Sequence, residues 1–150
     1  PPLVYGPDAP GNFGKLVGWI KRGLPIPLAG IRDNRRSFVG VENLADFVVL
    51  SAAHPGAAGE TFHVADAEVL STSDLVCRLA KLLDRRSRVW SVPPELLAWS
   101  ALVVGRRDMA RQLLGSLEVD ASKAWRVLAW RPPRSVDQGL RYAVSPSTTA

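Results

Sequence analysis

Cysteine and histidine are almost absent from this sequence. Its 150 residues include one cysteine, Cys77, and two histidines, His54 and His63. A single cysteine excludes an internal disulfide and a cysteine-based zinc site, and two histidines do not suffice for a histidine metal cluster. We therefore expect no metal site, and a fold that depends on an ordinary apolar core.

Long apolar segments and repeats are also missing. The longest run of apolar-type residues, 96–105, is too short to span a bilayer, and no signal peptide is visible. The chain has no internal repeat, and its 47% hydrophobic and 22% charged residues are typical of a globular domain. We expect a cytoplasmic protein without a membrane partner.

The charge is positive but not concentrated. The chain has 19 Lys and Arg residues against 14 Asp and Glu residues, a net charge of +5. The basic residues form several separate groups with acidic residues among them, whereas a nucleic-acid-binding surface needs a basic stripe with aromatic side chains. The five tryptophans lie mostly in apolar stretches, which favours core positions. We expect no nucleic-acid partner, although the arginine groups suit a smaller anion such as phosphate.

The pattern of apolar residues and turn signals predicts an α/β fold with short strands and many helices. We expect strands at residues 3–5, 36–41, 61–65 and 89–92. We expect helices at residues 12–22, 43–53, 71–83, 94–104, 107–114, 122–128 and 135–144. Asn12 and Asn43 are candidate N-caps, and Ser71 with Asp74 and Ser135 with Gln138 have the spacing of capping boxes.

Residues 11–18, GNFGKLVG, superficially match a dinucleotide-binding fingerprint, because they follow a strand and begin a helix. That fingerprint needs its first glycine in a tight turn directly after the strand. Here a loop with two prolines separates Tyr5 from Gly11. We favour the alternative, in which Gly14 and Gly18 make one helix face thin for close packing.

Five segments in order form a more specific pattern. They are residues 1–7 (PPLVYGP), 12–13 (NF), 36–46 (RSFVGVENLAD), 59–64 (GETFHV) and 120–140, which contains DASKA, LAWRP and GL. In order and spacing they resemble the C-terminal half of the extended short-chain dehydrogenase/reductase family, specifically its nucleotide-sugar epimerases and dehydratases. The resemblance covers nearly the whole chain.

This resemblance implies a domain organisation. Residues 1–7 would be the last piece of a Rossmann-type sheet, residues 8–144 the substrate-binding domain, and residues 145–150 a frayed tail. The Rossmann domain with its GxxGxxG loop and the Tyr-x-x-x-Lys pair of complete family members are absent from this sequence. We therefore assign no catalytic residue and expect the isolated chain to be inactive.

The resemblance also implies a function for the parent protein. It would be an NAD-dependent sugar epimerase similar to UDP-glucose 4-epimerase, with NADP as the alternative cofactor and a UDP-sugar as substrate. A nucleotide-sugar dehydratase, a 4-keto reductase and a non-catalytic binding module are the alternatives. A homo-oligomer stays open.

The resemblance further assigns ligand contacts. It implies that Asn12 and Arg36 bind the diphosphate of the UDP-sugar, and Arg111 is the candidate for a second phosphate contact. An extended piece that consists of Pro25, Ile26, Pro27 and Leu28 would lie along the uracil, and Pro1 would contact the nicotinamide end of the cofactor. The alternatives are a plain N-cap for Asn12 and a solvated surface position for Arg36.

Overall fold

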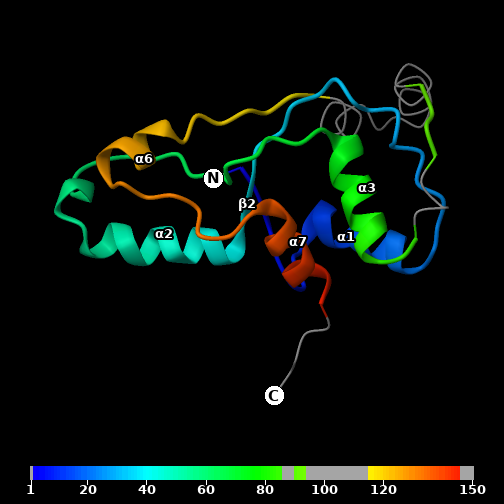
Figure 1. The fold of residues 1–150 in the computed structure, drawn as a ribbon, viewed down its shortest axis with the longest axis horizontal. Helices are drawn as coiled ribbons and strands as arrows, with labels where there is room; N and C mark the ends of the chain where they lie inside the picture. The colour runs from blue at the N-terminus through cyan, green and yellow to red at the C-terminus, as the bar shows by residue number, and fades with distance from the viewer. Residues whose placement is uncertain (1, 86–89, 94–114, 146–150) are drawn as a thin grey trace. The chain divides into compact units, whose positions relative to one another are not determined.

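The computed structural model describes residues 2–85, 90–93 and 115–145, and Figure 1 shows the path of the chain. Contacts divide the chain into two compact units. Unit 1 comprises Pro1–Ala9, Ser37–Val69 and Glu118–Ala150, and unit 2 comprises Pro10–Arg36 and Leu70–Leu117. The predicted helices at residues 94–104 and 107–114 lie outside the described residues.

Unit 1 contains a small parallel sheet with helices. Its strands are β1 (Leu3–Tyr5) and β2 (Phe38–Gly40), which pair in parallel with Val4 opposite Val39. Its helical elements are α2 (Val41–Ala53), the short 3-10 helix η1 (Pro55–Ala57), α6 (Ser122–Val127) and α7 (Val136–Val144). Helix α2 follows β2 without a loop, and α7 contacts both strands.

The core of unit 1 is aromatic at its centre. Phe47 of α2 packs edge-on against Trp130, with 5.2 Å between ring centroids, and against Phe62 at 6.0 Å. Such edge-to-face pairs add about 0.5–1.5 kcal/mol to the burial of the rings themselves. Val39 of β2 and Ala124 of α6 complete the same cluster and are fully buried. These contacts join α2, β2 and α6 around one core.

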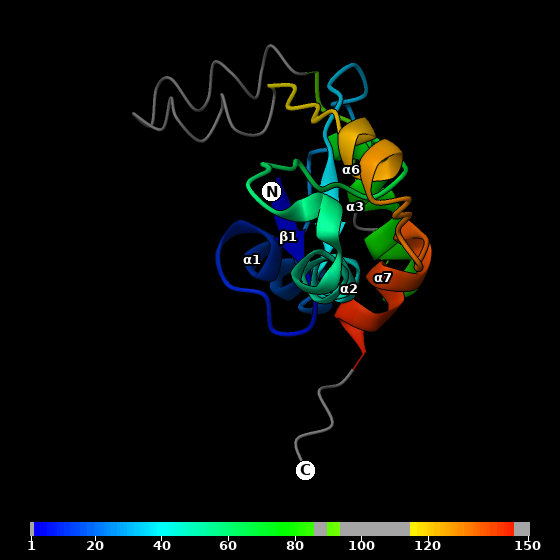
Figure 2. The ribbon, with the colours of Figure 1, turned by 90° about the vertical axis from the view of Figure 1, so that its left-hand side faces the viewer.

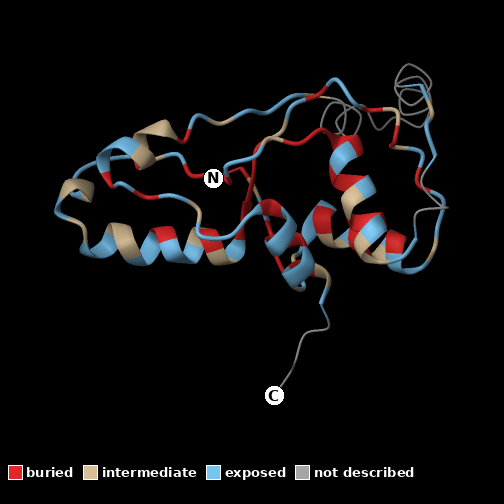
Figure 3. Ribbon diagram, in the orientation of Figure 1, coloured by how far each residue is buried: buried red, intermediate tan, exposed pale blue. Residues whose placement is uncertain are grey.

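Unit 2 contains helices α1 (Gly11–Lys21) and α3 (Thr72–Leu82), which contact each other. Both helices bury side chains at intervals of three and four residues, as amphipathic helices do. Those of α1 are Phe13, Val17 and Ile20, and those of α3 include Leu75, Val76 and Leu79. Figure 3 shows this alternation of buried and exposed residues along α3.

The α/β fold class is confirmed, and so are both capping boxes, at Ser71 and at Ser135. The predicted N-caps at Asn12 and Asn43 are wrong, because the N-cap positions belong to Pro10 and Gly40. Figure 2 shows α2, which begins directly after Gly40, almost along its axis. The expected domain boundaries stay a prediction.

Two further expectations need correction. Residues 61–65 do not form a strand. Beside them, the N–H of Asp66 donates a backbone hydrogen bond to the carbonyl of Phe38 in β2 at 2.8 Å, and one such bond does not make a ladder. The expected strand at 89–92 is reduced, in its described part, to one bridge between Ser91 and Leu28. Trp130 is a core residue as expected, but Trp19 and Trp90 are exposed.

Candidate functional site

The described residues among those predicted to bind a ligand fall in one unit. Asn12, residues 25–28 and Arg36 all belong to unit 2. Pro1 and Arg111 lie outside the described residues. The structure therefore brings the described candidates into a single compact unit, and the local contacts of each can be considered in turn.

Residues 25–28 pair with a second segment, but Pro27 lies in a turn, so the piece is not extended throughout as expected. The N–H of Trp90 donates to the carbonyl of Ile26 at 2.9 Å, and the N–H of Ala29 donates to the carbonyl of Trp90 at 3.1 Å. Leu28 and Ser91 form an antiparallel bridge. Ile26 is 1% exposed and anchors this piece in the core of unit 2, whereas Pro25 and Pro27 are exposed. An anchored piece of this kind can offer apolar contact to a flat ligand.

Arg36 lies where two chain segments meet. Its backbone exchanges hydrogen bonds with Leu70 at 2.9 and 3.0 Å and forms a parallel bridge with Leu117. Its Nη1 donates to the carbonyl of Gly115 at 2.9 Å. Burial lowers the pKa of the Arg36 guanidinium below its ordinary value, but an arginine in a protein keeps its charge. The carbonyl of Gly115 thus orients the guanidinium without neutralising it.

Arg35, the neighbour of Arg36, is exposed. Its backbone N–H donates to the Oγ of Ser116 at 3.0 Å, and its carbonyl accepts from the N–H of Leu117 at 2.8 Å. The two arginines therefore differ in environment, because Arg36 is half-buried and Arg35 is not. A half-buried guanidinium is the better candidate for a charged hydrogen bond to phosphate, since water competes with it less.

Asn34 holds this region against the start of α3. Its Nδ2 donates to the Oγ1 of Thr72 at 2.8 Å, and its Oδ1 accepts from the N–H of Thr72 at 2.9 Å. Next to it, the N–H of Ser73 donates to the carbonyl of Ile31 at 2.9 Å. Asn34 is buried. No local sequence signal marks it, because its partner is 38 positions away in the chain.

Asn12 is the second residue of α1 and is exposed. Its side chain does not act as the N-cap, since Pro10 occupies that position without a side-chain cap bond. Residues at the first turn of a helix lie near its unpaired backbone N–H groups, which favour anions. The position of Asn12 is thus compatible with the phosphate contact that the resemblance implies, and that contact stays a prediction.

The two units have formal charges of opposite sign. Among the described residues, unit 2 has nine Lys and Arg residues and three Asp and Glu residues, a formal charge of +6. Unit 1 has five and nine, a formal charge of −4. The basic groups appear scattered along the sequence, but the fold collects most of them in unit 2. A positive unit favours an anionic ligand.

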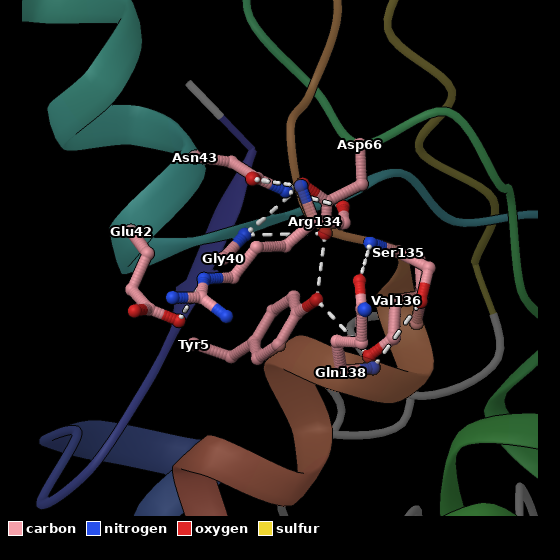
Figure 4. A network of polar contacts seen from close by, with 9 residues as sticks. All are labelled: Tyr5, Gly40, Glu42, Asn43, Asp66, Arg134, Ser135, Val136 and Gln138. Atoms are coloured by element: carbon pink, nitrogen blue, oxygen red, sulfur yellow. Dashed lines mark hydrogen bonds and ion pairs between the residues drawn. The ribbon is translucent and has the colours of Figure 1, made fainter.

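The polar centre of unit 1 is the carboxylate of Asp66, drawn in Figure 4. It accepts hydrogen bonds from the hydroxyl of Tyr5 at 2.7 Å, from the Nδ2 of Asn43 at 2.7 Å and from the N–H of Gly40 at 3.2 Å. Asn43 also exchanges two bonds with the backbone of Arg134, each 3.0 Å long. This buried network joins β1, β2, α2 and the segment before α7.

The network favours the protonated form of the Tyr5 phenol. Burial, and then the hydrogen bond to Asp66, raises the pKa of the Tyr5 phenol above its ordinary value. A tyrosine that transfers protons near neutral pH needs the opposite shift. A shallow pocket beside the network is lined by Tyr5, Glu42, Arg134 and Tyr142 among others. Glu42 and Arg134 form an ion pair there, with 2.8 Å between Oε2 and Nε.

Comparison with known proteins identifies the fold and its relatives. No protein-family model matches the chain. A UDP-glucose 4-epimerase of Vibrio cholerae is 34% identical over 143 residues, which are 94% of this chain and 43% of that protein. A UDP-glucose 4-epimerase of Thermotoga maritima, solved with UDP-glucose, superposes with a TM-score of 0.69 at 19% identity, over 95% of this chain and 42% of that one. The chain is thus similar to one part of these epimerases and has the fold of that part.

A third similar protein was solved with two ligands. WbmF of Bordetella bronchiseptica, solved with NAD+ and UDP, superposes with a TM-score of 0.66 at 22% identity, over 94% of this chain and 42% of that one. The chain spans less than half the length of the relatives that it matches. The resemblance stated from the five motifs is confirmed.

Structures similar to this chain were solved with NAD, and residues 11–18, which follow the loop between β1 and α1, are the part of this chain that resembles a dinucleotide-binding fingerprint. Residues 6–10, which include two prolines, connect β1 to α1, and Gly11 follows only after them with a φ of +76°. A Cβ at Gly18 would meet nothing within 4 Å, so the expected close packing there is wrong. The described residues therefore do not form a dinucleotide loop.

Other kinds of site have little support in the described residues. No group of three or more His, Cys, Asp or Glu side chains is placed to hold a metal ion in that part of the chain. Among the helices described, none has the length and apolar character needed to cross a bilayer.

Proposed function

We propose that this chain is the nucleotide-sugar-binding part of an NAD(P)-dependent sugar epimerase similar to UDP-glucose 4-epimerase. The observation that carries the proposal is the 34% identity to the Vibrio cholerae enzyme over 94% of this chain. The positive charge of unit 2 and the oriented guanidinium of Arg36 support it, because a nucleotide-sugar is recognised largely through its diphosphate.

In this proposal each candidate residue has a distinct role. Arg36 and Asn12 bind the diphosphate, with Arg111 as a further phosphate contact, and residues 25–28 lie along the uracil. Pro1 contacts the nicotinamide end of NAD(P). Since the described residues do not form a dinucleotide loop, we assign the remainder of the cofactor site to parts of the protein outside this sequence, and we derive no chemical step here.

The proposal extends to the setting of the enzyme. We propose that it acts in the cytoplasm, and a homo-oligomer stays open. A nucleotide-sugar dehydratase is the second candidate, because dTDP-glucose 4,6-dehydratase of Bacillus anthracis, solved with NAD, has a TM-score of 0.68 over 95% of this chain.

The test is turnover of UDP-glucose by the intact protein with NAD. We expect UDP-galactose as the product, and we expect the 150-residue chain alone to give none, because it lacks the cofactor loop and the Tyr-x-x-x-Lys pair. A 4-keto-6-deoxy sugar as the product would favour the dehydratase. An intact protein that neither converts nor binds any UDP-sugar would refute the proposed function.

A further inference from the structure

Trp90 is an exposed tryptophan whose position calls for an explanation. Its side chain is 63% exposed, against 3% for Trp130 in the core of unit 1. Tryptophan contributes most to stability when it is buried, and an exposed indole is often a contact surface for a partner or ligand. Because the core that the described residues of unit 2 form does not bury this ring, the ring is open to another contact.

The backbone of Trp90 is fixed beside the piece that we assign to the uracil. Trp90 donates to Ile26 and accepts from Ala29, at 2.9 and 3.1 Å. The two paired segments are also close together at Gly30, where a Cβ would collide with the carbonyl oxygen of Val92. Only glycine fits so close to a neighbouring backbone. The indole is therefore carried on a segment held against residues 26–30.

The segment assigned to the uracil contains no aromatic ring. Residues 24–30 read LPIPLAG, so they can offer aliphatic and proline contacts to a base but no aromatic face. Ile26 is buried, whereas Pro27 and Trp90 are exposed. The exposed side chains of the paired segments also include Leu24, Pro25, Ser91 and Pro93, and among them the indole of Trp90 is the aromatic one. An indole is the best of the side chains for stacking on a planar base, because both partners present π faces.

We propose that Trp90 stacks on the uracil of the bound nucleotide and thereby determines much of the affinity for the base. This inference rests on the proposed function, because it assumes a nucleotide ligand beside residues 25–28. It separates the recognition of the ligand into two parts. Trp90 binds the base, and the positive charge of unit 2, including Arg36, binds the phosphates.

The test measures the binding of UDP and of inorganic pyrophosphate to the intact protein by calorimetry. We expect Trp90→Ala to weaken UDP binding roughly 5- to 150-fold, the usual loss for one stacked base. Trp90→Phe, which keeps a smaller ring, should lose less. Pyrophosphate has no base, so its affinity should be unchanged, and this result would also show that the variant is folded.

The matched control is Trp19→Ala, because Trp19 is a second exposed tryptophan of unit 2, on α1, and has a 48% exposed side chain. We expect it to bind UDP as the wild type does. If the wild type binds UDP and Trp90→Ala binds it equally well, the role of Trp90 is refuted and the proposed function stands. If the wild type does not bind UDP, the proposed function fails, and the inference fails with it.

Discussion

At the scale of single residues, the contacts of Asp66 and Lys123 differ in what they contribute. Asp66 is 5% exposed and accepts hydrogen bonds from Tyr5, Gly40 and Asn43. Lys123 contacts Glu60 at 2.6 Å, but both side chains are more than 40% exposed. Buried donors left without a partner are costly, whereas exposed ion pairs contribute about 0–1 kcal/mol. The Asp66 network therefore stabilises unit 1 more than the ion pair does.

We predict that Tyr5→Phe lowers the free energy of unfolding by about 1.5–3 kcal/mol, because it removes a hydrogen bond to a carboxylate. Glu60→Gln should cost less than about 1 kcal/mol. Urea unfolding of the chain at pH 7 measures both changes. Equal losses for the two variants would contradict the ranking.

The raised pKa of Tyr5 also predicts a pH dependence. The native state keeps the phenol proton, while the unfolded chain releases it above its ordinary pKa of about 10. The unfolded state thus binds fewer protons above that pH, and the stability present below it declines as the pH rises further. We expect the free energy of unfolding to fall more steeply above about pH 10 in the wild type than in Tyr5→Phe. Parallel curves for the two proteins would refute this.

At the scale of elements, two glycines have opposite surroundings. A Cβ at Gly139 of α7 would lie 2.6 Å from the hydroxyl oxygen and 3.0 Å from the Cε2 of Tyr5, whereas a Cβ at Gly18 of α1 would meet open space. We predict that Gly139→Ala destabilises the chain by about 1–3 kcal/mol through overpacking. Gly18→Ala should stabilise it by about 0.5–1 kcal/mol, because alanine favours helices. Thermal unfolding of both variants tests this, and the same sign for both would be a contradiction.

The elements that could be predicted from the sequence are those with local signals. The capping boxes at Ser71 and Ser135 depend on a residue three positions away, and both are present. Asn43 has the chemistry of a cap, but its amide is used by Asp66 and Arg134, 23 and 91 positions away. A sequence pattern does not reveal such distant partners. Residues 61–65 have a strand-like sequence, but they lack the ladder of hydrogen bonds that defines a strand.

The candidate site could be predicted from the sequence only through the family resemblance. Arg36 and residues 25–28 are found in unit 2 by that route, whereas Trp90 was expected in a core. Burial of a tryptophan depends on which segments pack over it, and this is a property of the fold. The concentration of positive charge in unit 2 was missed for the same reason, because it follows from how separate segments associate.

At the scale of the whole molecule, α2 has an apolar face that stays exposed in the described part of the chain. Its exposed apolar residues are Val41, Ala45, Val48, Val49, Ala52 and Ala53, of which Val49 is 71% exposed. The sheet beside it has only two strands in the described part, fewer than an independent sheet needs. Exposed apolar faces of this kind drive association.

We predict that the 150-residue chain self-associates when it is produced alone, and that Val49→Glu reduces this association by placing a charge on the apolar face. Because the side chain of Val49 is largely in solvent, the substitution should change stability little. Light scattering over a range of concentrations measures the effect. A monodisperse monomer at high concentration, with valine in place, would show that this face does not associate.

The central claim is that unit 2 binds the diphosphate of a nucleotide through Arg36, and the most direct test is the affinity of the intact protein for UDP. We predict that Arg36→Ala weakens UDP binding about 10- to 150-fold, with partial recovery in Arg36→Lys, and leaves the affinity for uridine unchanged. The exposed neighbour supplies the control, since Arg35→Ala should bind UDP like the wild type. Wild-type affinity for UDP in Arg36→Ala would contradict the account.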